Sequence, residues 1–272
     1  MSGFSADWLS LREPIDHAAR NRDVLTKVKD LLAEQDTPTI TDLAAGTGST
    51  VSALDAFIEK PVTWQLVDYD EDLLQMAAKR PVSGTVKVSR VDMAQSLSGT
   101  IEGNPDLVTT SAFLDLVSEE WLKGLVDLLA AEGLPFYAAL TYDGRAGVMP
   151  PLAEDQNVIS LFNRHQLTDK GFGDALGPKA AETAVRLFQQ AGFEVFSGRS
   201  DWEADKDQKA FQKALLYGWQ DAASDIDHRH TADFVVWLGE RLALIDEGAG
   251  RLFVGHVDFL AIPKERPKNG AS

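Results

Sequence analysis

The segment 39–50, TITDLAAGTGST, constrains the fold of this chain more than any other stretch. A β-branched run passes through Asp42 into a turn with two glycines, and the helical pattern of residues 49–58 follows directly. A strand, a glycine turn and a helix in this order are typical of open α/β sheets, which bind ligands at the carboxyl ends of their strands. The pattern predicts a ligand site around Gly46 and Gly48, although a turn that binds nothing can have the same pattern.

Short β-branched runs alternate with helical patterns along much of the remaining chain. The predicted strands are 39–43, 62–67, 86–91, 107–110, 136–141, 193–197 and 251–262. The predicted helices are 14–35, 49–58, 70–79, 118–130, 180–190, 207–223 and 232–245. This alternation predicts a Rossmann-like α/β fold: a seven-stranded, mostly parallel sheet with helices on both faces, plus an N-terminal helix and a helical insertion before the last strand.

We expect one main domain with additions. Residues 1–36 form an N-terminal helical cap, 37–263 form the main domain, and 264–272 form a flexible tail. Within the main domain, 143–180 is rich in glycine and proline, which predicts an irregular lid over a binding site. The helical insertion 203–250 is either an added layer or dimer surface, or part of a cover over the substrate.

Charge and composition exclude several classes of protein. The 272 residues include 42 acidic and 26 basic side chains, a net charge of −16, which repels phosphate backbones and anionic lipid headgroups. The chain has no cysteine, so disulfides, thiolate metal sites and thiol catalysis are excluded. No secretion signal is visible, and no apolar run reaches the roughly 18 residues of a membrane helix. We expect a cytoplasmic protein that binds neither nucleic acid nor membranes, with a homodimer left open.

Acids also follow the next two predicted strands. Asp68 lies 22 residues past Gly46, where a carboxylate can accept hydrogen bonds from both hydroxyls of a ribose. A strand-terminal aspartate is equally often a helix cap, but Asp70 can cap the following helix and leave Asp68 for a ligand. Asp92 follows the third strand. Together with Asp42, these acids are expected to converge on one edge of the sheet.

A dinucleotide-binding loop is an alternative interpretation of the glycine turn. That loop has the pattern G-x-G-x-x-G, in which the last glycine lets the helix pack closely on the strand. Here Val51 occupies the position of the last glycine. An NAD-dependent dehydrogenase is therefore disfavoured.

The run from Asp42 to Gly48, with Asp68 and the pair Asp92-Met93, resembles the class I S-adenosylmethionine-dependent methyltransferases. The similarity covers about residues 37–142 and implies S-adenosylmethionine as cofactor. The residues that the resemblance assigns to the cofactor are Asp42, Ala44, Gly46, Gly48, Asp68, Tyr69, Asp92, Met93 and Ser111. The one departure is at Ala44, where the family usually has glycine.

The resemblance implies an enzyme that transfers a methyl group to oxygen or nitrogen of a small-molecule acceptor. Such an enzyme holds the nucleophile in line, about 3–3.5 Å from the methyl carbon, and a base takes its proton where one is needed. Candidate catalytic residues are Asp115, Tyr142 and His165. We favour His165 because an unperturbed imidazole titrates near neutral pH, although a surface histidine is the alternative. The alternative function is a methyltransferase-like protein that binds the cofactor without turnover, for example an assembly factor.

Other residues keep two interpretations each. Arg145 either binds an acidic substrate group or pairs with Asp143, and an arginine of segment 11–20 either holds the cofactor carboxylate or forms a surface salt bridge. His256 and Asp258 share one face of the last strand without a third ligand, so we expect no metal site. The candidates for an aromatic wall around the substrate are Phe113, Phe162, Phe172 and Trp202.

Overall fold

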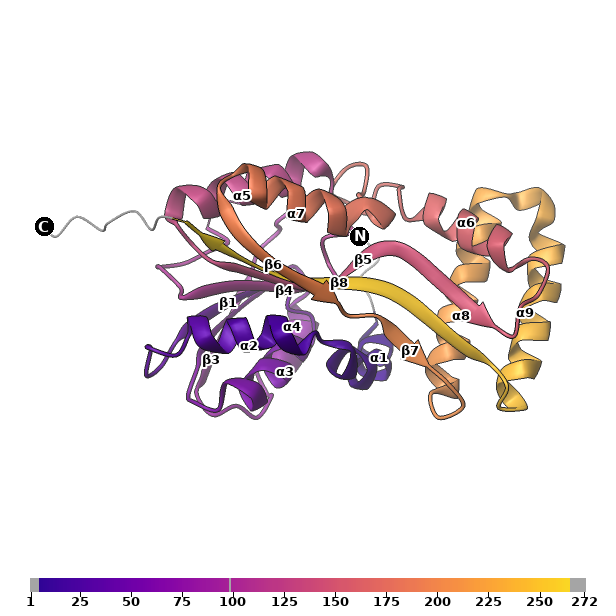
Figure 1. The fold of residues 1–272 in the computed structure, drawn as a ribbon, viewed down its shortest axis with the longest axis horizontal. Coiled ribbons are helices and arrows are strands. Elements are labelled where there is room, and N and C mark those ends of the chain that lie inside the picture. Colours follow the sequence, from indigo (N-terminus) through magenta and orange to yellow (C-terminus); the bar gives the residue numbers. More distant parts are fainter. Residues whose placement is uncertain (1–4, 98, 265–272) are drawn as a thin grey trace, which may run out of the picture.

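An eight-stranded mixed sheet organises the chain (Figure 1). This computed structural model describes residues 5–97 and 99–264. The strands are β1 (Thr39–Leu43), β2 (Thr63–Asp68), β3 (Thr85–Arg90), β4 (Leu107–Ser111), β5 (Phe136–Met149), β6 (Phe193–Arg199), β7 (Trp202–Ala204) and β8 (Arg251–Pro263). Their order is β3-β2-β1-β4-β5-β8-β6, with β7 beside β8, and β8 runs antiparallel to β5, β6 and β7.

Helices cover both faces of this sheet. They are α1 (Ala6–Ala19), α2 (Arg22–Leu31), α3 (Ser49–Ile58), α4 (Glu71–Ala77), α5 (Glu119–Glu132), α6 (Asp155–His165), α7 (Ala180–Gln190), α8 (Lys209–Ile226) and α9 (Thr231–Asp246). In Figure 1, α2, α3 and α4 lie below the sheet, and α5 and α7 lie above it. Each face has its own apolar core, one around Trp64 and the other around Phe136, Phe188 and Phe259. Within the described residues, no helix is long and apolar enough to cross a bilayer.

The predicted Rossmann-like fold is confirmed, with one strand more than expected. The added strand is β7, whose three residues are too few to show an alternating pattern. The helical insertion before the last strand is also confirmed, since α8 and α9 connect β7 to β8. Asp70 caps α4, as expected, by accepting hydrogen bonds from the backbone N–H groups of Asp72 and Leu73.

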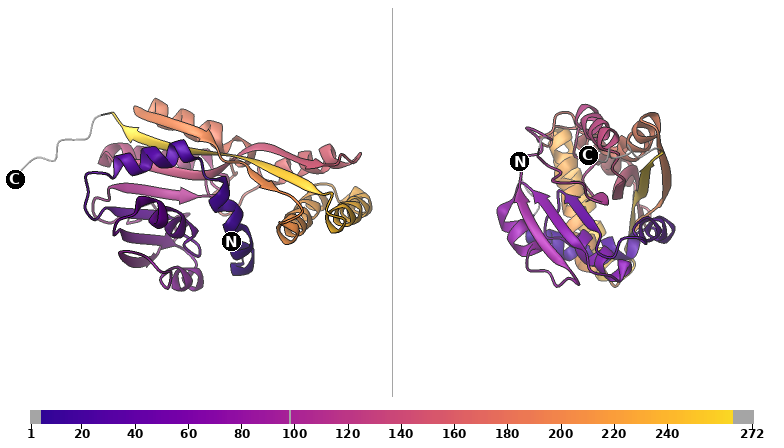
Figure 2. Two further views of the ribbon diagram at one scale, coloured as in Figure 1. Left: turned by 60° about the horizontal axis from the view of Figure 1, so that its bottom comes forward. Right: turned by 90° about the vertical axis from the view of Figure 1, so that its left-hand side faces the viewer.

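Strands β5 and β8 are much longer than the parallel strands beside them. They have 14 and 13 residues, whereas β1 has five. Their distal halves project beyond the carboxyl ends of β1 and β4, and α6, α8 and α9 pack around this projection (Figures 1 and 2). Two register shifts bend β5, between Ala138 and Thr141 and between Tyr142 and Ala146. Leu140, in the first bulge, has a φ of 52°.

The single N-terminal helix predicted over residues 14–35 is wrong. The chain forms α1 and α2, separated at Arg20 and Asn21, and each begins at a side-chain cap. Ser5 accepts a hydrogen bond from the N–H of Trp8, and Asn21 accepts one from the N–H of Val24. Pro14 therefore lies inside α1 and not in its first turn, on an exposed side of the helix.

The irregular lid predicted over 143–180 is also wrong in its structure. Its first part is the distal half of β5, and its middle contains α6, which is followed by a 3-10 turn at Gly177–Lys179. Gly147 pairs with Phe253 of β8 within the strand. Glycine is needed there because a Cβ would lie 2.3 Å from the Phe253 ring. The glycines that suggested a loop instead permit close packing and turns. The tail predicted for 264–272 lies outside the described residues except for Lys264.

A buried ion pair holds α6 to α9 at the far end of the projection. Asp155, at the start of α6, accepts hydrogen bonds from Trp237 Nε1 at 2.8 Å and from Arg241 Nε at 3.1 Å. Arg241 also donates to the carbonyl of Pro150 at 2.7 Å, and its side chain is only 2% exposed. Both charges are thus withdrawn from water and depend on each other.

We expect Asp155→Ala to lower the free energy of unfolding by about 3–5 kcal/mol, because it leaves the buried Arg241 without its counter-charge. Urea denaturation followed by circular dichroism measures the change. Asp207→Ala is the control, because Asp207 pairs with Lys206 where both side chains are about two-thirds exposed, and its effect should be small beside that of Asp155→Ala. Equal effects of the two variants would contradict the assignment.

Candidate functional site

The loop between β1 and α3 has a backbone that few side chains tolerate. Ala44, Gly46 and Gly48 have φ values of 54°, 52° and 80°. Gly48 is the residue before the first turn of α3 and provides no side-chain cap, so the first N–H groups of that helix are left for other partners. The positive φ at Ala44 explains why glycine suits this position better, since alanine is strained there.

Asp68 holds this loop against β2. Its Oδ2 accepts a hydrogen bond from the N–H of Gly46 at 2.8 Å, and its Oδ1 accepts one from the N–H of Asp70 at 2.9 Å. The expectation that Asp68 is left to a ligand is therefore incomplete, because both oxygens already accept hydrogen bonds within the protein. Asp68 lies beside the loop and is half-buried, at the carboxyl edge where the sequence predicted it.

Helix α1 covers the glycine loop from the outside. A Cβ added at Gly46 would lie 3.4 Å from Leu9 Cδ1. Arg80 joins the two elements, since it pairs with Glu13 of α1 and donates from Nε to the carbonyl of Thr47 at 2.5 Å. Figure 2 shows α1 between the parallel strands and the distal helices. No local pattern predicts the pairing of Arg80 with Glu13, because the two residues are far apart in the chain.

Asp42 is the most deeply buried acid at this edge. It is 1% exposed, and its Oδ1 accepts a hydrogen bond from Thr109 Oγ1 on β4 at 2.7 Å. Burial raises the pKa of Asp42 to about 7, although the hydrogen bond from Thr109 and the positive charge of Arg20 act in the opposite direction. Near neutral pH this carboxyl is therefore divided between its charged and neutral forms.

The segment after β3 lies against a group of aromatic rings. Phe113, Trp121 and Phe172 contact one another edge to face, with ring centroids 5.4–5.5 Å apart. Trp121 Nε1 donates to the carbonyl of Met93 at 2.7 Å. Asp92 accepts from the N–H of Ala94 at 3.1 Å, which fixes the turn. Tyr69, by contrast, is 45% exposed, and its ring faces Arg90.

A buried polar network lies where α1 and α2 meet the sheet. Arg20, 3% exposed, donates to Tyr137 on β5 and to Ser111 at the end of β4, both at 3.3 Å. Tyr137 in turn donates to Asp258 at 3.1 Å, and Asp258 also accepts from the N–H groups of Asn21 and Leu140. Arg20 therefore brings a positive charge next to Ser111 and is not a surface salt-bridge residue.

Asp115, beyond the end of β4, lies near Tyr142, which belongs to β5 just past its first bulge. Burial raises the pKa of Asp115 to about 6, while Arg12 and Lys170 oppose that shift. Burial and the charges of Asp143 and Asp115 raise the pKa of Tyr142, whose hydroxyl donates to Asn163 of α6 at 2.6 Å. Of the three predicted catalytic residues, these two share one environment.

His165 lies at the end of α6, against α8. Its Nε2 is 3.6 Å from Asp225, and its Nδ1 is 3.4 Å from Lys170 Nζ. Burial first, and then the charge of Lys170, lower the pKa of His165. Lys170 also opposes the pKa shift of Asp115, so its ammonium connects the surroundings of His165 with those of Asp115. Sequence reasoning missed Lys170, which no motif marks.

The predicted aromatic wall forms two separate groups. Phe113 and Phe172 belong to the trio with Trp121. Phe162 and Trp202 belong to a second group. The ring centroids of Trp202 and His256 are 4.5 Å apart, and the ring centroid of Tyr142 lies 6.0 Å from that of His256 and 6.0 Å from that of Phe162. Burial lowers the pKa of His256 to about 3, so the imidazole in this second aromatic group is neutral at physiological pH.

Arg145 forms ion pairs with two acidic side chains of the protein. Its guanidinium donates to Asp143 at 2.7 Å and to Asp201 at 2.7 and 3.0 Å. The sequence left open whether Arg145 binds an acidic substrate group or pairs with Asp143. In the structure it pairs with Asp143. Among the described residues, no cluster of three histidine, aspartate or glutamate side chains is arranged to hold a metal ion.

No protein-family model matches the chain, and no curated protein matches it by sequence. Solved structures do match. A candidate methyltransferase from Bacillus halodurans C-125 aligns with 89% of this chain and 100% of its own length, at 13% identity and a TM-score of 0.51. The YcgJ protein from Bacillus subtilis aligns with 90% of this chain and 100% of its own, at 12% identity and a TM-score of 0.50.

A third solved structure is a SAM-dependent methyltransferase from Geobacter sulfurreducens in complex with S-adenosyl-L-homocysteine. It aligns with 90% of this chain and 92% of its own, at 13% identity and a TM-score of 0.46. At such identities the comparisons define a shared fold. The chain thus has a Rossmann-like fold in common with solved structures that include a candidate methyltransferase.

The buried carboxyl of Asp42 predicts a pH-dependent stability. Its pKa rises from 3.8 to about 7 on folding. Between these values the folded state holds a proton that the unfolded state releases, so the free energy of unfolding falls as pH rises through this window. Asp42→Asn removes the titration and keeps an acceptor for Thr109. The gain in stability over the parent protein should therefore be about 3 kcal/mol larger at pH 8 than at pH 5.

Urea denaturation of both proteins at the two pH values measures this difference. Other titrating groups, including Asp115 and His256, are present in both proteins and cancel in the comparison. The same effect of Asp42→Asn at pH 5 and pH 8 would mean that the pKa of Asp42 is not raised.

Proposed function

We propose that this chain is a methyltransferase that uses S-adenosylmethionine, yields S-adenosylhomocysteine, and methylates a small molecule on oxygen or nitrogen. The observation that carries the proposal is the loop between β1 and α3. It has three positive-φ positions, and the N–H of the middle one, Gly46, donates to Asp68, the acid that ends β2. The fold in common with a candidate methyltransferase supports the proposal.

The residues at the carboxyl edge fit an adenosyl group with an amino-acid end. Gly48 lets the loop lie close to the end of α4, because a Cβ there would lie 3.2 Å from Ala77 Cβ, and its φ of 80° suits glycine. Asp68 offers carboxylate oxygens, which suit the two hydroxyls of a ribose. The uncapped first turn of α3 suits a carboxylate. The rings beside Met93 suit a flat purine.

The cofactor-binding residues in this proposal are Asp42, Ala44, Gly46, Gly48, Asp68, Tyr69, Asp92, Met93 and Ser111. Arg20 is added to them because its buried guanidinium already contacts Ser111. Val51 argues against a dinucleotide here, since its side chain is fully buried between α3 and the sheet where such a loop has its last glycine.

S-adenosylmethionine held by these residues would supply an electrophilic methyl carbon bonded to a positively charged sulfur, with S-adenosylhomocysteine as the leaving group. The protein's residues hold the acceptor in line and take its proton. We assign the proton to the carboxylate of Asp115, because its pKa of about 6 leaves it charged at neutral pH yet more basic than an ordinary carboxylate. Tyr142, fixed by Asn163, orients the acceptor.

Cofactor binding is tested by calorimetric titration with S-adenosylmethionine, S-adenosylhomocysteine and NAD. We expect micromolar binding of the first two only. Asp68→Ala should weaken that binding at least tenfold, about 1.4 kcal/mol, because it removes the acid beside the glycine loop. Asp72→Ala is the matched control, since Asp72 is exposed on α4 just beyond β2. Unchanged affinity in Asp68→Ala would remove Asp68 from the site.

The base is tested by the pH profile of S-adenosylhomocysteine formation with a panel of small alcohols, phenols and amines. If Asp115 is the base, the rate rises with pH through about 6, and Asp115→Asn removes this rise and lowers turnover by at least a hundredfold. His165→Ala should keep the profile. If His165→Ala removes the rise with pH and Asp115→Asn keeps it, His165 is the base. Tight cofactor binding without turnover of any acceptor would favour a protein that binds the cofactor but has no activity.

A further inference from the structure

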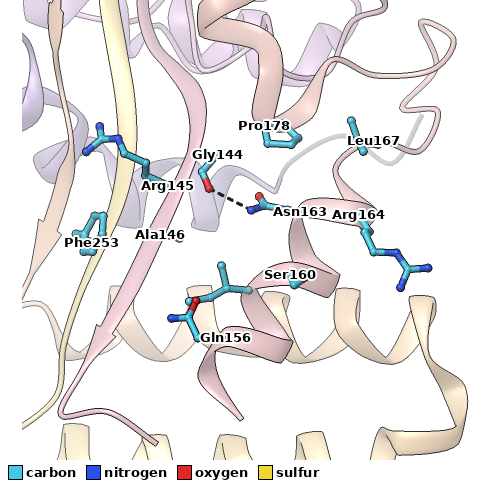
Figure 3. Close-up of a pocket in the computed structure, with 11 residues that line it drawn as sticks. Gly144, Arg145, Ala146, Gln156, Ser160, Asn163, Arg164, Leu167, Pro178 and Phe253 are labelled. Atoms are coloured by element: carbon cyan, nitrogen blue, oxygen red, sulfur yellow. Dashed lines mark hydrogen bonds between the residues drawn. The ribbon is translucent and has the colours of Figure 1, made fainter. Parts of the chain in front are cut away.

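An open groove runs between the distal half of β5 and α6 (Figure 3). Its volume is about 530 Å³, within the roughly 300–1,000 Å³ typical of small-molecule sites. The residues that line it are Gly144, Arg145, Ala146, Gln156, Ile159, Ser160, Asn163, Arg164, Leu167, Pro178 and Phe253. None of these residues was a candidate for catalysis or cofactor binding.

The groove adjoins both residues to which we assigned acceptor chemistry. Asn163 forms part of its wall and accepts the hydrogen bond from the hydroxyl of Tyr142. At the other end, Pro178 follows Gly177, whose N–H donates to the carbonyl of Asp115 at 2.9 Å. Asn163 thus lies between a molecule in the groove and Tyr142, and Pro178 with Gly177 lies between that molecule and the backbone of Asp115.

Asn163 presents a fixed amide to the groove. Its Nδ2 donates to the carbonyl of Gly144 at 3.1 Å, while its Oδ1 accepts from Tyr142 at 2.6 Å. Each contact uses one of the two donor or acceptor positions at that atom, so one N–H and one lone pair are left for a ligand. The dashed line in Figure 3 marks the contact with Gly144. Ser160 and Gln156, on the same helix, add further neutral polar groups.

The charges at the groove are either paired or directed away. Arg145 is bound to Asp143 and Asp201. Arg164 is exposed, and its guanidinium points away from the strand in Figure 3. No acid occurs among the described lining residues, and the remaining surface is apolar, from Ile159, Leu167 and other side chains. A charged ligand would lose hydration here without gaining a buried counter-charge.

We propose, resting on the function proposed above, that this groove receives the methyl acceptor, and that the acceptor is an uncharged, mainly apolar small molecule with a hydroxyl or amino group hydrogen-bonded by Asn163. Acidic acceptors are excluded from this class because Arg145 is already neutralised and the guanidinium of Arg164 points away from the strand. Asn163 is a positioning residue, since it acts through Tyr142 and through the ligand's polar group.

The test uses a matched pair of probes, 6-hydroxy-2-naphthalenemethanol and 6-hydroxy-2-naphthoate. The first has a neutral hydroxymethyl group at the carbon where the second has a carboxylate. Each is titrated into protein saturated with S-adenosylhomocysteine, and naphthol fluorescence anisotropy measures binding. We expect the neutral probe to bind at least tenfold more tightly than the anionic one. Binding of neither probe, or tighter binding of the anion, would overturn the assignment of substrate class.

Two variants on one helix locate the site. Ser160→Trp fills the groove at an exposed position, and Asn157→Trp adds the same ring to an exposed position of α6 outside the groove. We expect Ser160→Trp to weaken binding of the neutral probe at least tenfold and Asn157→Trp to leave it unchanged, with S-adenosylhomocysteine affinity preserved in both. Equal probe affinity in the two variants would show that the acceptor binds elsewhere.

The same titrations separate the two proposals. If the parent protein does not bind S-adenosylhomocysteine, the proposed function is contradicted. Normal S-adenosylhomocysteine binding together with a probe that is insensitive to Ser160→Trp would contradict only the groove. As a check on positioning, Asn163→Ala should raise KM for an acceptor of this class at least tenfold, and Asn163→Gln should fail to restore it because its longer side chain cannot keep both contacts.

Discussion

The buried carboxylate of Asp258 is the interaction on which the arrangement of the site depends. It accepts hydrogen bonds from the N–H of Leu140, the hydroxyl of Tyr137 and the N–H of Asn21. The first contact satisfies the backbone of the bulge that bends β5, and the last fixes the start of α2. One side chain on β8 thus joins the projecting strands to the N-terminal helices, and no water is available there to replace it.

The bulge in β5 also explains how one sheet serves two purposes. Up to Ala139 the strand pairs with β4 in the parallel part of the sheet, whose edge carries the glycine loop and its acids. Beyond Thr141 it pairs only with β8 and presents the groove to α6. Tyr142 lies just past the first bulge, where its hydroxyl donates to Asn163 and the charge of nearby Asp115 contributes to its raised pKa. The cofactor and acceptor regions proposed above therefore meet at the point where the strand changes direction.

Local patterns in the sequence were enough to predict the parallel half of the fold and the residues at its edge. The residues of α3 match the predicted helix, since a glycine turn and an apolar periodicity are both local. The distal half of β5 was missed because Gly144 and Gly147 are there for long-range reasons: a Cβ would meet Pro178 at the first and Phe253 at the second. Arg80 and Asn163 were missed for the same reason, because their partners are distant in sequence. Lys170 bonds to His165 and Thr168 nearby in the chain, but no motif marks it.

Helix α1 rests on the glycine loop through a few side chains, namely Leu9 on Gly46, Glu13 with Arg80, and His17 beside Ser49. Two of these three contacts are polar and partly exposed, so releasing the helix from the loop costs far less free energy than unfolding the sheet beneath it. A ligand bound to the loop would have to share the loop's surface with the helix. Docking of the N-terminal segment and occupancy of the loop are therefore thermodynamically linked, and either one changes the other by the same factor.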